Sequence, residues 1–177
     1  MQTDATFWDS LVFDGMDDVD VEAVTAVFGS IDVTARGRAA GAACPDGGRP
    51  SNQVHDSYQR RLKDLPLAEQ SVLIHLTVRR FICSTDNCPR RTFAQPFAQL
   101  TAPYARFTTW LSQVLERVGL ALAGRAGARL TAHLGFQVGR MTLLHMVMAM
   151  PDPHPARRAC WVWTTSLPAV GRPTQPS

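Results

Sequence analysis

The hydrophobic positions of the chain follow one period before residue 100 and another after it. In the first part, apolar and polar residues alternate, as in Val72, Ile74, Leu76 and Val78, and a period of two is typical of half-buried β-strands. The alternation predicts strands at Val21–Phe28, Ile31–Arg36, Ser57–Leu62 and Ser71–Ile82. Gly29-Ser30 is the predicted hairpin turn of the first pair and Asp64-Leu65-Pro66 that of the second, with an acidic loop at Asp14–Asp20 before them.

After residue 100 the period becomes 3.6, which predicts helices. Thr101 is the predicted N-cap of a first helix that carries Pro103 in its first turn and ends at Gly124. A second helical segment, Arg125–Met150, breaks around Gly135. A short amphipathic helix is also expected at Thr6–Phe13.

These elements predict an α+β protein in three parts. Residues 1–100 form a small β-rich domain that resembles a zinc ribbon and begins with the short helix. Residues 101–151 form an α-helical domain, and residues 152–177 form a proline-rich linker and a disordered tail. A length of 177 residues suits one ordinary domain or two small ones.

Composition excludes several classes of protein. The chain has no apolar run of membrane-spanning length and no secretory signal, so we expect a cytoplasmic protein with reduced cysteines. The net charge of +3 hides a split, because residues 1–30 hold seven acidic residues and no Lys or Arg, while the rest of the chain is basic. An arginine-rich body suits a phosphate-bearing partner such as nucleic acid, although arginine enrichment also follows from GC-rich coding.

Three cysteines have the placement of zinc-ribbon ligands. Cys83 and Cys88 flank a turn at the end of a predicted strand, and Cys44-Pro45 precedes Gly48 as in a zinc knuckle. A structural zinc needs four ligands, but position 47, where a second cysteine is expected, is Gly47. The predicted metal ligands are therefore Cys44, Cys83 and Cys88, with weak or absent zinc binding. Ordinary loop cysteines, or a fourth ligand from His55, are the alternatives.

The segment Gly127–Met146 fits the twenty-residue helix-turn-helix template, with Gly135 at the turn. The template predicts buried side chains at Leu130, Leu134, Phe136, Met141 and Leu144. Residues suited to DNA contacts are those on the first helix and at the start of the second, which are Arg125, Arg129, Gln137, Arg140 and Thr142. A simple helical hairpin with arginines on its solvent-exposed face is the alternative.

Together these motifs resemble the N-terminal region of ISL-three-type insertion-sequence transposases. The resemblance covers roughly residues 6–158. It is carried by Cys44-Pro45-x-x-Gly48, by Val54-His55-Asp56-Ser57-Tyr58, and by Val78-Arg79-Arg80-Phe81-x-Cys83-x4-Cys88-Pro89-Arg90-Arg91. It implies a zinc ribbon and a helix-turn-helix that bind the terminal inverted repeats of a transposon. A later nuclease domain with three acidic residues supplies catalysis in that family. Gly47, and Gln95 where an acidic residue is usual, depart from the pattern.

The C-terminal end departs further. Where the family has a Leu-Gly-Val-Asp-Asp-like strand, this chain reads Cys160-Trp161-Val162-Trp163-Thr164. Codons for these residues, read in another frame, can encode that strand, so we interpret residues 160–177 as an out-of-frame tail. An ordinary terminal loop is the alternative. The prediction is a transposase fragment without the nuclease, and therefore not an enzyme.

The implied partners are double-stranded DNA at transposon ends and a second copy of the chain or a full-length transposase. No membrane partner is implied, and the implied location is the nucleoid.

Three other interpretations of the function remain. A small zinc-ribbon and helix-turn-helix transcription regulator shares both motifs, and a redox or metal enzyme would use Cys83 and Cys88. A non-functional gene product is the third.

Overall fold

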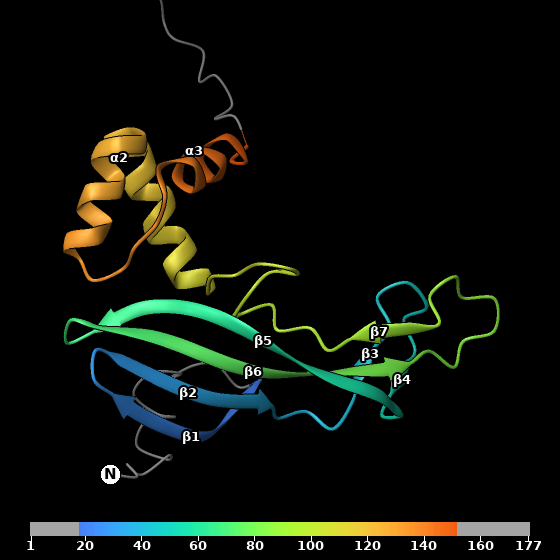
Figure 1. Ribbon diagram of the computed structural model, residues 1–177. Helices are drawn as coiled ribbons and strands as arrows, with labels where there is room; N and C mark the ends of the chain where they lie inside the picture. The colour runs from blue at the N-terminus through green and yellow to red at the C-terminus, as the bar shows by residue number, and fades with distance from the viewer. Residues whose placement is uncertain (1–17, 152–177) are drawn as a thin grey trace, which may run out of the picture.

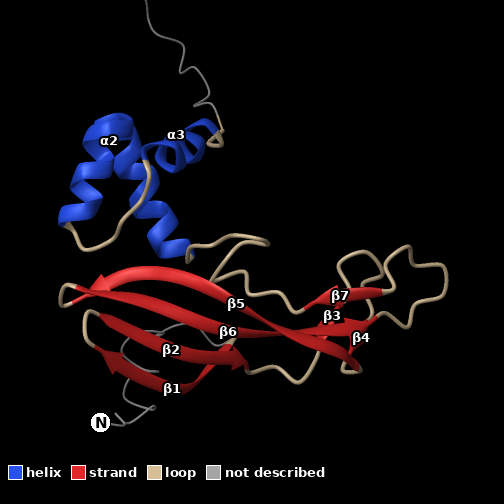
Figure 2. Ribbon diagram, viewed as in Figure 1, coloured by secondary structure: helices blue, strands red, loops and turns tan. Residues whose placement is uncertain are grey.

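The computed structural model describes residues 18–151, so the predicted helix at Thr6–Phe13 and the tail after Pro151 lie outside the described residues. Within this range, seven strands are followed by two helices (Figures 1 and 2). This arrangement confirms the α+β class. Within residues 18–151, no helix has the length and apolar character needed to cross a membrane.

A five-stranded sheet forms the body of the molecule. Its path runs β1 (Val19–Val27), β2 (Ser30–Gly37), β6 (Gln70–Ile82) and β5 (Val54–Leu67), with the short β7 (Thr92–Ala94) paired to the end of β6. The β2–β6 pair is parallel and the other pairs are antiparallel. The predicted alternation on β6 is confirmed, since Val72, Ile74, Leu76 and Val78 are all buried on one face.

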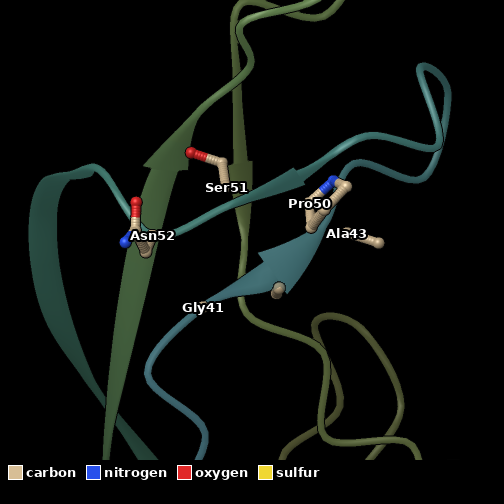
Figure 3. Close-up of a pocket in the computed structure, with 6 residues that line it drawn as sticks. Gly41, Ala43, Pro50, Ser51 and Asn52 are labelled. Atoms are coloured by element: carbon tan, nitrogen blue, oxygen red, sulfur yellow. The ribbon is translucent and has the colours of Figure 1, made fainter.

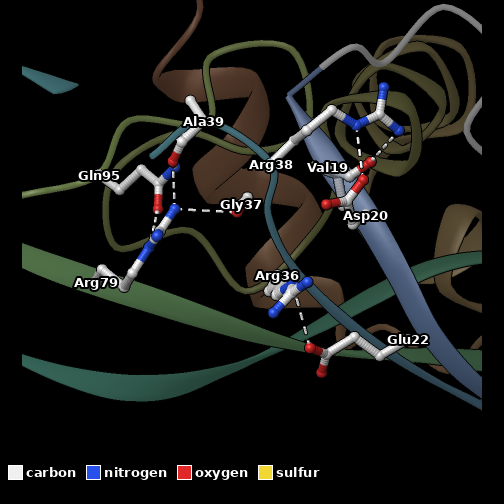
Figure 4. A network of polar contacts seen from close by, with 9 residues as sticks. All are labelled: Val19, Asp20, Glu22, Arg36, Gly37, Arg38, Ala39, Arg79 and Gln95. Atoms are coloured by element: carbon white, nitrogen blue, oxygen red, sulfur yellow. Dashed lines mark hydrogen bonds and ion pairs between the residues drawn. The ribbon is translucent and has the colours of Figure 1, made fainter. Parts of the chain in front are cut away.

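The first hairpin follows the sequence prediction closely. It turns at Gly29, whose φ of 85° lies in the left-handed region that glycine adopts without a side-chain penalty. The predicted acidic loop ends earlier than expected, because β1 begins at Val19 and includes Asp20. Asp20 pairs with Arg38 at 2.6 Å, and Glu22 pairs with Arg36 at 3.3 Å (Figure 4).

The second hairpin corrects the prediction. The chain does not turn at Asp64-Leu65-Pro66; β5 continues to Leu67, and the turn falls at Ala68-Glu69, where φ is 49° and 65°. The register of β5 on β6 shifts between Asp64 and Leu67, so Leu65-Pro66 forms a bulge. A proline is tolerated there because β5 is an edge strand.

One end of the sheet continues into a smaller lobe, in which β3 (Ala42–Ala43) pairs with β4 (Pro50–Ser51) beside β7 (Figure 1). Its core consists of Phe81 from β6, Phe93 from β7 and the buried Cys44. The aromatic rings of Phe81 and Phe93 lie 5.8 Å apart between centroids. The strand β6 therefore joins the main sheet to this lobe.

A partly buried polar contact lies at the junction between the main sheet and the smaller lobe. Arg79 donates to Gln95 Oε1 at 3.2 Å and to the carbonyl oxygens of Gly37 and Ala39 (Figure 4). Gln95, which departs from the family pattern, is 6% exposed and serves as the acceptor for Arg79. The departure at position 95 therefore has a structural role here.

The helices begin later than predicted. The first, α2 (Thr109–His133), is capped by Thr108, whose side chain accepts from the backbone N–H of Leu111, so the predicted cap at Thr101 is wrong. The Thr101 hydroxyl instead donates to the carbonyl of Phe107. The predicted end at Gly124 corresponds to a bend, because Ala123 has φ 54° and ψ −172° and the chain becomes helical again after it.

The second helix, α3 (Arg140–Met148), packs inside the bend of α2. The approach is close at Gly119 and Gly127, where an added Cβ would lie 2.7 Å from Val147 Cγ2 and 2.9 Å from Leu143 Cδ1. Residues without side chains on α2 thus make room for α3. The connection between the helices rests against the end of β5, since a Cβ on Gly135 would lie 3.4 Å from Pro66 Cβ.

The predicted burial pattern of the helix pair is largely wrong. The turn at Gly135 is confirmed by its φ of 86°, and Phe136 is buried. The other four predicted core positions are exposed, namely Leu130, Leu134, Met141 and Leu144. The buried side chains are instead Thr131 on the second half of α2 and Leu143 on α3. The bend at Ala123 and the contact with α3 turn a different face of each helix inward.

Candidate metal centre

The three predicted ligands meet in the smaller lobe. Cys44 follows β3, Cys83 follows β6 directly, and Cys88 lies within the loop between β6 and β7. The sulfur atoms of all three lie within 4.8 Å of one another, and Cys44 Sγ and Cys88 Sγ are 3.9 Å apart. Tetrahedral zinc with Zn–S bonds of about 2.3 Å requires sulfurs about 3.8 Å apart. The three thiols therefore fit three corners of a zinc site.

The backbone holds these thiols in place. The N–H of Cys83 donates to the carbonyl of Arg91 at 2.9 Å, and the N–H of Cys44 donates to Arg49 at 3.0 Å. The N–H of Gly47 donates to Cys44 Sγ at 3.3 Å, which is the knuckle contact that the sequence predicted. These bonds position the sulfurs through the fold of the lobe.

The fourth corner has no ligand from the described part of the chain. Gly47 faces the cluster, since an added Cβ would lie 3.3 Å from Cys88 Sγ. His55, the alternative ligand, is outside the group of residues that converge here and lies 3.7 Å from the carboxylate of Asp56. The metal-binding groups that converge within residues 18–151 are thus three thiols. Weak or absent zinc binding stays a prediction.

The electrostatic surroundings differ between the thiols. The backbone N–H of Thr85, acting as a hydrogen-bond donor, lowers the pKa of Cys83 to about 7. The Thr85 hydroxyl is close enough to add to this effect, but it makes no hydrogen bond of acceptable geometry. The pKa of Cys88 is raised, because burial and the neighbouring sulfurs outweigh the backbone N–H of Arg90.

Sequence reasoning missed Thr85. Its hydroxyl oxygen is shielded from solvent and lacks a hydrogen-bond partner among the described residues. It would lie 2.9 Å from a Cβ on Gly47, on the open side of the thiols. The sequence marks Thr85 only by its position two residues after Cys83. That position alone does not predict a role, because residues between two ligands serve many purposes.

The predicted DNA-contacting residues gather on the helix pair. Arg125 and Arg129 are exposed on the second half of α2 and are four residues apart, so they share one face. Gln137 lies in the connection before α3, which begins at Arg140, so its predicted place on the second helix is wrong. Gln137 and Arg140 are exposed, and Thr142 is half-buried. Arg140 lies beside the bend, with its Cβ 3.5 Å from the position of a Cβ on Gly124. Their role in binding DNA stays a prediction.

One further pocket lies at the β3–β4 hairpin (Figure 3). It is lined by small and amide side chains and by backbone, from Gly41, Ala42, Ala43, Pro50, Ser51 and Asn52. None of these residues carries a charge or a strong metal ligand, so the pocket offers no chemistry beyond hydrogen bonding.

The geometry defines a zinc ribbon in which one ligand position is replaced. Comparison with family models agrees, because residues 40–88 match the zinc-finger of transposase IS204/IS1001/IS1096/IS1165. The matched segment includes all three cysteines and the β5–β6 hairpin between them, so residues 40–88 are similar to the zinc-ribbon domain of ISL3-type transposases. Comparisons with curated proteins and with solved structures give no significant match.

Proposed function

We propose that this chain is a DNA-binding fragment of a transposase and that it recognises the terminal inverted repeats of an insertion sequence. The match of residues 40–88 to a transposase zinc-finger carries the proposal. The helix pair that follows the ribbon supplies the contact surface, with the segment around Gly135 as a helix-turn-helix.

Charge supports this assignment of roles. Residues 101–151 contain five Arg and one Glu, a net charge of +4, and no other acidic residue. No ion pair within residues 18–151 involves Arg125, Arg129 or Arg140. Exposed guanidinium groups without a carboxylate partner bind phosphate at little cost in broken contacts, so this surface suits the backbone of DNA.

The start of α3 and the residues just before it are the part suited to base contacts. Gln137 and Arg140 each carry a side chain able to make paired hydrogen bonds to a base edge. Several exposed side chains of α3 are apolar, with Met141 52% and Met148 79% exposed, and His145 is exposed beside them. DNA contacts are therefore expected from Gln137, from Arg140 and from the adjoining face of α2, while the exposed methionines suit a protein neighbour.

The test is a binding titration with the purified chain and a duplex that carries a terminal inverted repeat, compared with a scrambled duplex of equal length. Wild type should prefer the repeat, and its log affinity should fall linearly with log salt. The double variant Arg125→Ala/Arg129→Ala should weaken binding to both duplexes and reduce the salt slope by about two, or about one for each lost phosphate contact. Gln137→Ala should weaken only the preference for the repeat.

Arg36→Ala is the matched control, because Arg36 lies on β2 and is paired with Glu22. It should leave affinity and slope unchanged. Absence of binding to any terminal repeat, or equal losses in the control and the double variant, would refute the proposal.

The out-of-frame interpretation of residues 160–177 is a separate part of the proposal, and these residues lie outside the described range. The nucleotide sequence after the codon for Cys160 tests it directly. A nuclease strand rich in aspartate in the second frame is the expected result. Its absence contradicts this part and leaves the DNA-binding proposal standing.

A further inference from the structure

The open corner of the cysteine cluster has a defined position and a defined neighbour. A side chain at position 47 would enter the cluster between Cys88 Sγ, 3.3 Å from its Cβ, and Thr85 Oγ1, 2.9 Å away. Gly47 has no side chain, so this space lies between Cys88 Sγ and the Thr85 hydroxyl, and the backbone N–H of Gly47 donates to the sulfur of Cys44. The absence of a side chain at position 47 therefore leaves a defined space beside the sulfurs.

Thr85 gives that space a polar wall. Its hydroxyl is shielded from solvent, and it has no hydrogen-bond partner within residues 18–151. Buried hydroxyl groups in folded proteins almost always have a partner. A small polar ligand held next to the three sulfurs would supply one.

We propose that Cys44, Cys83 and Cys88 form a three-thiolate metal site whose fourth position is open to a small exogenous ligand, and that the site favours thiophilic ions that are complete with three sulfurs. With a tetrahedral ion, water or a small thiol takes the fourth position beside Thr85. Soft thiolate donors select soft ions, and nothing in the described donor set adds oxygen or nitrogen ligands. The site does not depend on DNA binding.

Trivalent arsenic is the sharpest probe of such a site, because its lone pair occupies the fourth position. Arsenous acid reacts with the three thiols to form three As–S bonds and releases three waters. The thiol protons leave with the hydroxyl groups, and no atom changes oxidation state. Zinc and Co²⁺ have no such lone pair and need a fourth donor.

The experiment restores the fourth thiol in the full chain. Gly47→Cys alone would press its Cβ against Thr85, so the test variant is Gly47→Cys/Thr85→Ala. The matched control is Gly47→Ala/Thr85→Ala, which adds the same Cβ without sulfur. Zinc affinity is measured by chelator competition, Co²⁺ binding by its absorption spectrum with and without a small added thiol, and arsenite affinity by competition with a fluorescent dithiol reagent. Circular dichroism checks that each variant folds.

In wild type and in the alanine control, the Co²⁺ spectrum should change when the small thiol is added. In the cysteine variant it should not change, and zinc affinity should exceed that of the control by at least about tenfold, since even outer-shell partners are worth that much. Arsenite affinity should be the same in all three proteins. Failure of wild type to bind any of these ions, a Co²⁺ spectrum indifferent to added thiol, or equal zinc affinities in the two variants would overturn the proposal.

Discussion

Thr108 joins the start of α2 to the sheet, and its replacement tests how the two parts are held together. The residue is fully buried. Its hydroxyl oxygen accepts from the N–H of Leu111 at 3.2 Å and donates to Asp64 Oδ1 at 2.5 Å. Its backbone N–H also donates to the carbonyl of Lys63 on β5 at 3.0 Å.

Thr108→Val keeps the shape and branching of the side chain and removes both hydroxyl contacts. Loss of the N-cap bond costs about 1 kcal/mol. Loss of the hydrogen bond to the Asp64 carboxylate costs about 1.5 kcal/mol, the low end of the range for bonds to charged groups. The low end applies because Asp64 still accepts from the N–H of Leu65. The expected decrease in the free energy of unfolding is therefore about 2–3 kcal/mol. Thr108→Ser keeps the hydroxyl and loses one methyl group, for about 1 kcal/mol.

The assay is urea unfolding followed by far-ultraviolet circular dichroism, with the midpoint compared at unchanged m value. Thr109→Val is the matched control, since the described structure records no side-chain hydrogen bond for Thr109; its effect should stay within about 0.5 kcal/mol. Asp64→Asn combined with Thr108→Val should cost less than the sum of the two single changes, because the residues share one contact. Equal effects of the valine changes at 108 and 109, or strict additivity with Asp64→Asn, would show that the hydroxyl does not link the helix to the sheet.

Four other predictions follow from local geometry. Ala68→Asn with Glu69→Gly should raise the urea midpoint, because both residues have positive φ in a two-residue hairpin turn that favours Asn-Gly; an unchanged or lower midpoint would contradict this. Ala123→Gly should stabilise the chain by about 1 kcal/mol in the same assay, since its φ and ψ belong to a region that only glycine adopts without strain, and destabilisation would refute it. In metal-free protein, alkylation of Cys83 should rise through about pH 7 as its thiol ionises, whereas Cys88 should need a higher pH; mass spectrometry of the labelled peptides checks the order, and the reverse order would contradict it. Metal removal with a chelator should leave the far-ultraviolet circular dichroism of the chain unchanged, and loss of the strand signal would refute that expectation.

The sequence predicted the features that depend on local pattern. The alternation along β6 identified its buried face, and the glycines at the β1–β2 turn and between the helices marked both turns. The spacing of Cys83 and Cys88, together with Cys44, predicted a cysteine cluster, and the structure brings the three sulfurs together. In each case the residue types act through contacts near them in the chain or through one simple pairing.

The wrong predictions share a different cause, which is tertiary contact. Thr101 and Thr108 are equally good caps in sequence, but the Thr108 hydroxyl donates a hydrogen bond to Asp64, while the Thr101 hydroxyl donates to the carbonyl of Phe107. The β5–β6 turn was misplaced because Ala68 and Glu69 adopt positive φ without glycine. No local pattern distinguishes these cases.

The three sulfurs can stay together without a fourth cysteine because the fold of their lobe does not depend on a metal alone. Free-standing zinc fingers unfold without their ion, since the ion supplies most of the folding free energy. Here the smaller lobe continues from β6, a thirteen-residue strand that pairs with β2 and β5 in the main sheet. Phe81 and Phe93 pack with Cys44, and backbone bonds from Ile82 to Gln53 and from Cys83 to Arg91 close the loops. The sulfurs are therefore held near one another by the sheet, which explains how Gly47 can replace a ligand without dispersing the other three.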